Sequence, residues 1–209
     1  MPSLLAEFEQ RVSTVLQLAE IGEVIRARAD EGSYARRALY PARLEALYEM
    51  AFLRIFANWE SFLEGSFIRY LCGYAGSSGP LNLINPPYRT LLHAETAVLG
   101  GQDYVSWSKP ASVVRRSQRF IRLGVHEVVV ASTQARLEWF AAVRHRVAHQ
   151  SSFSKQQFDT ATMGLVGRRY AGASPGRFLR DWNRSTVPQE RWIDSIGAEL
   201  KGLARQIVP

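Results

Sequence analysis

An all-helical fold is predicted for this chain of 209 residues, and three observations support it. Apolar residues recur at three- and four-residue steps over long stretches, and the longest stretch contains no proline. Clusters of proline and glycine mark the segments between the periodic stretches. With 46% hydrophobic and 22% charged residues, the composition is typical of a globular protein. We therefore expect one all-α domain over residues 1–209, a helical bundle with an irregular, loop-rich insertion at about 73–112.

Two helices are expected in the first third of the chain. The first spans about 3–29, with Ser3 as its N-cap and Gly32 as the glycine that follows its end. The second begins near Pro41, because proline is favoured in the first helical turn, and runs for about 30 residues. Its apolar stripe is wide, which predicts a central position in the bundle.

The remaining expected elements are shorter and are separated by glycine, proline and serine. In chain order they are a brief helix at 91–95, a basic helix at 113–122, a helix over 125–149, a short helix capped by Ser154, a brief helix at 174–182 and a last helix from 186 onward. The run Val128–Val130 is typical of strands, but this weak propensity is readily overridden by tertiary context.

The formal net charge of +7 favours a polyanionic partner, because Lys and Arg supply most non-specific affinity for nucleic acids. Arg115, Arg119 and Arg122 follow one another at i, i+4 and i+7, which predicts a basic stripe along one helical face. The stripe is either a track for RNA phosphates or a solvated face, and the net charge favours the track.

Several features bear on the compartment. The single cysteine excludes an internal disulfide, and no apolar run approaches the roughly 18–20 residues of a membrane span. The first ten residues carry Glu7 and Glu9 and no basic region, so they do not resemble a signal peptide. We expect a cytoplasmic protein with no membrane partner.

The segment Arg144–His149 is the strongest candidate site, because two arginines and two histidines follow directly on an apolar-periodic run. A metal interpretation needs Glu after the first histidine, as in His-Glu-x-x-His, but that position is Arg146. No third ligand is indicated, so we expect neither a metal nor another cofactor. A structural interpretation invokes the helix dipole, which favours cations in a last turn but does not explain four such residues.

RNA cleavage without metal is the third interpretation. The reaction needs a base for the ribose 2′-hydroxyl, an acid for the leaving 5′-oxygen and positive charge on the phosphate. His149 and Arg144 are suitable residue types. On an ideal α-helix, however, the two lie about 140° apart. Either a bend of the helix end or a second copy of the motif across a two-fold axis would bring them together, and the latter predicts a homodimer with a composite site.

The pattern Arg144-x-x-x-x-His149, with polar His145 directly after the arginine, resembles the Arg-polar-x-x-x-His signature of the HEPN superfamily. The helical context resembles the MAE-type and RiboL-PSP-type branch over roughly residues 40–207. The segments that carry this likeness are Trp59-Glu60-x-Phe62-Leu63-Glu64, Gly176–Trp182 and the tryptophan-bearing last helix.

This resemblance implies an up-and-down helical bundle, a dimer that joins two motifs in one cleft, and metal-independent endoribonuclease activity. Its products would carry 2′,3′-cyclic phosphate and 5′-hydroxyl ends. Such proteins act as toxins, often beside an antitoxin, or in anti-phage defence. Because some HEPN proteins are not catalytic, a non-catalytic module that binds nucleic acid or a partner, or a dimerisation scaffold, is the alternative.

The resemblance also assigns roles. His149 would act as acid and base, Arg144 would hold the phosphate, and His145 would orient the site or the substrate. Arg146 is nominated as a supporting residue by adjacency. Glu60 is nominated because it shares a helical face with the carboxylate four residues on, and the pair is either solvated or braces a base.

Overall fold

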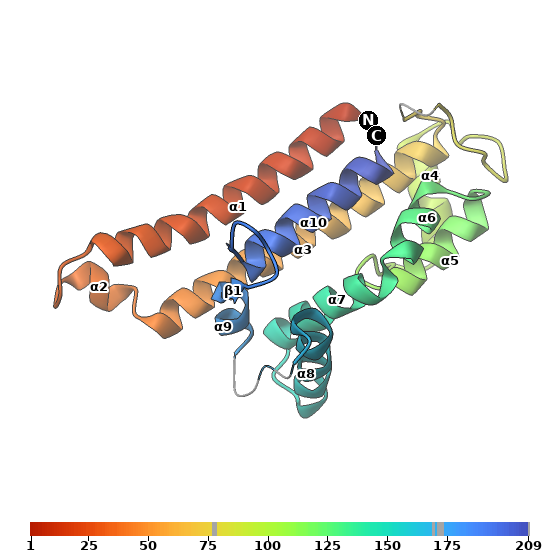
Figure 1. Cartoon of the computed structure of the whole chain (residues 1–209). Coiled ribbons are helices and arrows are strands. Elements are labelled where there is room, and N and C mark those ends of the chain that lie inside the picture. The colour runs from red at the N-terminus through yellow and green to blue at the C-terminus, as the bar shows by residue number, and fades with distance from the viewer. Residues whose placement is uncertain (77–78, 169, 171–173, 209) are drawn as a thin grey trace. The chain divides into compact units, whose positions relative to one another are not determined.

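The computed structural model describes residues 1–76, 79–168, 170 and 174–208. The elements, all but β2 labelled in Figure 1, are α1 (Pro2–Arg28), α2 (Tyr34–Ala38), α3 (Pro41–Leu71), α4 (Leu91–Leu99), α5 (Pro110–Phe120), α6 (Val125–Ser132), α7 (Gln134–Ala148), α8 (Ser152–Val166), α9 (Pro175–Arg180), β1 (Trp182–Asn183), β2 (Glu190–Arg191) and α10 (Trp192–Ile207). The predicted all-helical class is confirmed. No helix within the described ranges is long and apolar enough to cross a membrane.

The chain divides into two compact units. Unit 1 contains residues 1–9, 58–138 and 200–209, and unit 2 contains residues 10–57 and 139–199. The helices α1, α3, α7 and α10 each contribute residues to both units.

The core of unit 1 forms around the second part of α3. Phe8 of α1 packs against Phe62 with ring centroids 5.0 Å apart. Phe67 contacts Trp107 at 5.5 Å and Phe120 at the end of α5 at 6.1 Å. All five rings are buried, so these aromatic contacts fix α5 and the segment before it against α3.

The core of unit 2 joins α8, α9 and α10 around one aromatic side chain. Phe178 of α9 contacts Phe158 at 5.9 Å and stacks on Trp192 at 5.2 Å. At Gly176 a Cβ atom would lie 2.2 Å from the backbone oxygen of Glu45 in α3. Only glycine therefore allows α9 to approach the α3 backbone this closely.

The two predicted helices of the first third are present, and α3 begins at Pro41 as expected. Ser3 does not cap α1, because the helix has already begun and the Met1 carbonyl accepts the first backbone bond from Leu4. Gly32 has a left-handed φ of 77°, but it lies in the turn that leads to α2, a short helix that the sequence did not indicate.

The prediction of a single helix over 125–149 is wrong, because the helix is interrupted at Thr133, between α6 and α7. The hydroxyls of Ser132 and Thr133 both donate to the carbonyl of Val129, at 2.9 Å each. Such local side-chain bonds compete with the backbone ladder and end or bend helices. The valine run in α6 is helical, as predicted.

The C-terminal third differs from the prediction in two places. The brief helix expected at 174–182 ends at Arg180, and the last helix begins at Trp192 rather than near 186. A hairpin of β1 and β2 fills the interval. Its turn is held by the hydroxyl of Thr186, which donates to the Asn183 carbonyl at 3.0 Å and accepts from the Glu190 N–H at 3.0 Å.

Two of the expected loops include residues that the structure does not describe. Within the insertion at about 73–112, α4 is longer than the predicted 91–95, and α5 begins at Pro110. Residues 77–78 of the insertion and residues 169 and 171–173 of the loop before α9 lie outside the described residues.

Candidate functional site

The Arg144–His149 segment occupies the last turn of α7 and the residue that follows it, in unit 2. Val143 is fully buried, Arg144, His145 and Arg146 are half-buried, and His149 is exposed. The His149 N–H donates to the His145 carbonyl at 2.9 Å. The helical hydrogen-bond pattern therefore extends to the N–H of His149.

The two histidines form a pair on one face of the helix. Their ring centroids lie 4.7 Å apart with the planes tilted by 50°. Burial lowers the pKa of His145, and the nearby positive charges of His149 and Arg144 lower it further. Phe153, 61% exposed, presents its ring edge-on to His145 at 6.5 Å. A neutral imidazole beside a second imidazole suits proton exchange with a bound ligand.

Arg146 shapes the turn after the motif. Its Nη1 donates to the Ser151 carbonyl at 3.2 Å and to Ser154 Oγ at 3.3 Å. Ser154 is fully buried, and its hydroxyl donates to the His149 carbonyl at 2.6 Å. Ser154 therefore does not cap α8 as predicted. That role belongs to Ser151, whose side chain accepts from the Ser154 N–H at 3.1 Å.

The indole of Trp139 in α7 packs closely against α8, within unit 2. A Cβ atom at Gly164 would lie 2.3 Å from Cζ2 of the Trp139 indole. The absence of a side chain at Gly164 therefore allows the indole to lie directly on α8. Trp139 precedes Arg144 by five residues in the sequence. Together with the Arg146 turn, this contact fixes where the two histidines are presented.

The other predicted site residues belong to unit 1. Glu60 is half-buried on α3, and Arg115 and Arg119 are exposed on α5. Arg122 is not on that helix, because α5 ends at Phe120. The Arg122 N–H instead donates to the Asn82 carbonyl at 2.9 Å. The predicted stripe at i, i+4 and i+7 is therefore wrong at its last member.

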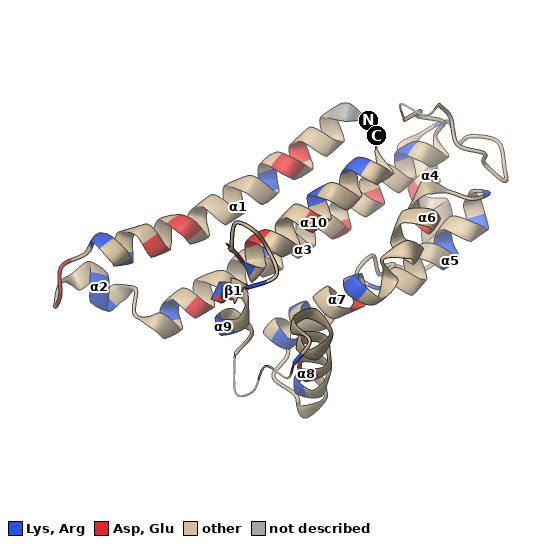
Figure 2. Ribbon diagram, viewed as in Figure 1, with Lys and Arg blue, Asp and Glu red and all other residues tan. Residues whose placement is uncertain are grey.

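Arg116 takes a place that the sequence did not indicate. Its guanidinium carbon lies 4.2 Å from the centroid of the Trp107 ring, and it lines the same cavity as Arg115 and Arg119. In Figure 2, α5 carries only basic charged positions. No local signal distinguishes Arg116 from its neighbours, since its partner comes from the preceding loop.

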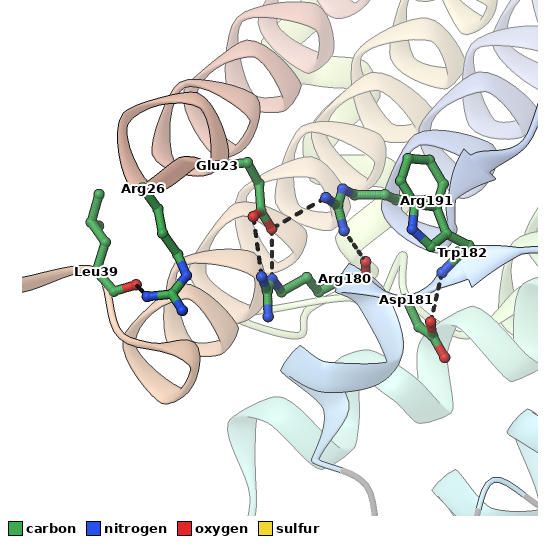
Figure 3. A network of polar contacts seen from close by, with 7 residues as sticks. All are labelled: Glu23, Arg26, Leu39, Arg180, Asp181, Trp182 and Arg191. Carbon is green, nitrogen blue, oxygen red and sulfur yellow. Dashed lines mark hydrogen bonds and ion pairs between the residues drawn. The ribbon is translucent and has the colours of Figure 1, made fainter. Parts of the chain in front are cut away.

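Unit 2 also contains an ion-pair network, shown in Figure 3. Arg180 Nε donates to Glu23 Oε1 at 2.6 Å, and Arg191 Nη2 lies 3.5 Å from the same oxygen. Burial raises the pKa of the Glu23 carboxyl, but the bonds and charges of Arg180 and Arg191 outweigh burial and lower it overall. These arginines connect α9 and the hairpin to α1.

Within the described ranges, no group of three or more His, Cys, Asp or Glu side chains is arranged to hold a metal ion. In comparisons with known proteins, no family model, no curated protein and no solved structure matches this chain.

Proposed function

We propose that this chain is a metal-independent endoribonuclease of HEPN type. The observation that supports the proposal most is the pair of imidazoles on α7, 4.7 Å apart, in the same six-residue segment as Arg144. The exposed imidazole of His149 can exchange protons, the neighbouring imidazole of His145 offers a hydrogen-bonding group, and the guanidinium supplies positive charge for a phosphate.

In this mechanism a base removes the proton of a ribose 2′-hydroxyl, and the 2′-oxygen attacks the adjacent phosphorus. The bond from phosphorus to the 5′-oxygen breaks, and an acid protonates that oxygen. His149 exchanges these protons, because it is exposed to a substrate. Arg144 binds the non-bridging oxygens, and His145, whose pKa is lowered, orients the substrate as a neutral hydrogen-bonding group.

The site is proposed to require two copies of the chain. On an ideal helix Arg144 and His149 lie about 140° apart, and the backbone bond from His149 to His145 continues the helical hydrogen-bond pattern to that residue. A second motif across a two-fold axis places an arginine of one copy beside a histidine of the other. Arg146 and Ser154 would then hold the motif in position without touching RNA.

The biological setting follows from the same proposal. An RNA-cleaving enzyme in the cytoplasm damages its host unless it is restrained, which suits a toxin with a cognate antitoxin or an anti-phage defence effector. The basic net charge of +7 adds attraction for RNA.

The proposal is tested by incubating the purified protein with total RNA in EDTA and analysing the ends of the products. We expect shortened RNA with 2′,3′-cyclic phosphate and 5′-hydroxyl ends from wild type and from His93→Ala, which removes an exposed histidine of α4. We expect none from His149→Ala. RNA that is bound in a salt-dependent manner but not shortened would contradict catalysis and would favour a non-catalytic binding module.

A further inference from the structure

A cavity of about 320 Å³ in unit 1 lies between the end of α4 and the face of α5. Three guanidinium groups line it, those of Arg115, Arg116 and Arg119, together with Ser112 and Gln102. Among the described residues that line the cavity, none is acidic. Three cations thus share one small concave surface without a lining carboxylate.

Arg116 is the most constrained of the three. Its guanidinium stacks on the Trp107 indole at 4.2 Å, and the Trp107 N–H donates to Glu64 Oε1 at 3.1 Å, which anchors the indole. Nη2 of Arg116 reaches the Ser106 carbonyl at 3.5 Å. Nη1 is buried and has no hydrogen-bond acceptor among the described residues. The side chain is therefore held in place while the N–H groups of Nη1 are unused.

Such an arrangement is energetically unfavourable without an acceptor. Burial lowers the pKa of Arg116, which reflects the cost of removing its charge from water. The negative charge of Glu64, outside the cavity lining, offsets part of this cost, and the positive charge of Arg115 adds to it. Elsewhere in the chain a comparable cost is offset by a carboxylate, since Arg180 donates to both oxygens of Glu23 at 2.6 and 3.1 Å. The arginine cavity of unit 1 has no such counterpart on its walls.

We propose that this cavity binds a phosphate group, carried by a ligand of nucleotide size. Tetrahedral phosphate presents several oxygens at once and matches the donor forks of more than one guanidinium. A volume of about 320 Å³ lies at the lower end of ligand pockets, which suits a small phosphate ester rather than a duplex. Ser112 adds a hydroxyl at the rim, where its oxygen accepts from Arg115 Nη2 at 3.1 Å.

The inference is independent of the proposed ribonuclease, because it concerns unit 1 and requires neither histidine of the motif. Two kinds of ligand carry such a phosphate group: a free nucleotide and the 5′-phosphorylated end of an RNA strand. In either case α5 contributes a specific site rather than a diffuse basic track.

The test is a titration of the full chain with inorganic phosphate and with 5′-AMP, at ionic strength held constant with chloride, followed by calorimetry and melting temperature. We expect saturable binding, weakened roughly tenfold or more in Arg119→Gln, which removes one exposed cavity arginine. Arg122→Gln is the matched control, since it removes the same charge from an exposed residue outside the cavity, and we expect a change of less than about twofold.

A 5′-phosphorylated oligonucleotide and its 5′-hydroxyl counterpart distinguish the two sources. Preference for the phosphorylated strand over 5′-AMP indicates an RNA end, and the reverse indicates a free nucleotide. No saturable binding of any phosphate probe, or equal weakening in Arg119→Gln and Arg122→Gln, would overturn the proposal. His149→Ala is expected to bind phosphate like wild type, so failure of the ribonuclease proposal and failure of this one are distinguishable.

Discussion

His126 in unit 1 and the pair His145 and His149 in unit 2 show the same side chain in opposite environments. His126 is fully buried, and its Nε2 lies 2.8 Å from Ser66 Oγ. That hydroxyl also donates to the Leu63 carbonyl at 3.1 Å, an arrangement that favours the proton on Nε2 over Nδ1. Nδ1 has no partner among the described residues, so protonation would bury an unsatisfied N–H.

The motif histidines meet the reverse conditions. His149 is exposed, and the two rings face each other at 4.7 Å beside a chain segment with two arginines. A buried histidine with a fixed tautomer stabilises a core, whereas a surface pair can exchange protons with a ligand. The comparison indicates that environment, rather than residue type, separates a packing histidine from a candidate catalytic one.

The largest expected effect comes from His149→Ala or Arg144→Ala. We expect the rate of RNA cleavage to fall about 10²–10⁴-fold in either variant, because each removes a group to which the proposed mechanism assigns a role at the reacting phosphate. The melting temperature of His149→Ala should change by no more than about 2 °C, since the side chain is exposed. Equal growth inhibition by wild type and both variants in expressing cells would contradict the assignment.

His126→Ala should act on stability instead. We expect a loss of about 2–4 kcal/mol in the free energy of unfolding, because the variant leaves a cavity and removes the partner of Ser66. Urea unfolding measures the loss. Cleavage per folded molecule should stay at the wild-type rate, and a selective loss of cleavage at full stability would break the distinction between the two kinds of histidine.

The acid dependence of stability sharpens the distinction. Burial lowers the pKa of His126 from 6.5 to about 3, so between these values the unfolded chain binds a proton that the folded chain does not. The free energy of unfolding therefore contains the full contribution of neutral His126 above about pH 6.5. It loses that contribution as the pH falls toward 3, at up to roughly 1.4 kcal/mol per pH unit. Unfolding at pH 7, 6 and 5 should show a shallower decline in His126→Gln than in His93→Gln. Parallel declines would argue against His126 as the source.

The smallest effect is expected from Arg146→Ala. The variant removes two hydrogen bonds to the turn that follows the motif, and we expect a loss of about 1–2 kcal/mol in unfolding free energy. Cleavage should fall less than in Arg144→Ala, because Arg146 contacts Ser151 and Ser154. A loss of activity as large as that of Arg144→Ala would place Arg146 among the groups that bind RNA.

Local sequence patterns predicted the helical class and the helix that begins at Pro41, because periodicity and proline placement act over a few residues. These patterns failed where contacts with a distant segment determine the end of a helix. Leu83 forms an isolated β-bridge with Ile121, and the Ile84 N–H donates to the Phe120 carbonyl. For this reason α5 ends at Phe120 and Arg122 lies outside it. No pattern within α5 reports those partners.

The candidate site shows the same division. His145 and His149 lie four residues apart, a spacing that puts two side chains on one helical face, and their ring centroids are 4.7 Å apart. Two other contacts join different segments of the chain, namely the bond of Ser154 to the His149 carbonyl and the stacking of Arg116 on Trp107. Residue spacing within one helix does not predict such contacts.

The central claim is that Arg144 and His149 act together from two copies of the chain. Its most direct test is to combine Arg144→Ala and His149→Ala chains by co-expression and to measure RNA cleavage in EDTA. A composite site predicts that two inactive variants regain roughly a quarter of wild-type activity, because half of randomly paired dimers carry one intact site of two. A mixture that stays as inactive as either variant alone would contradict the claim.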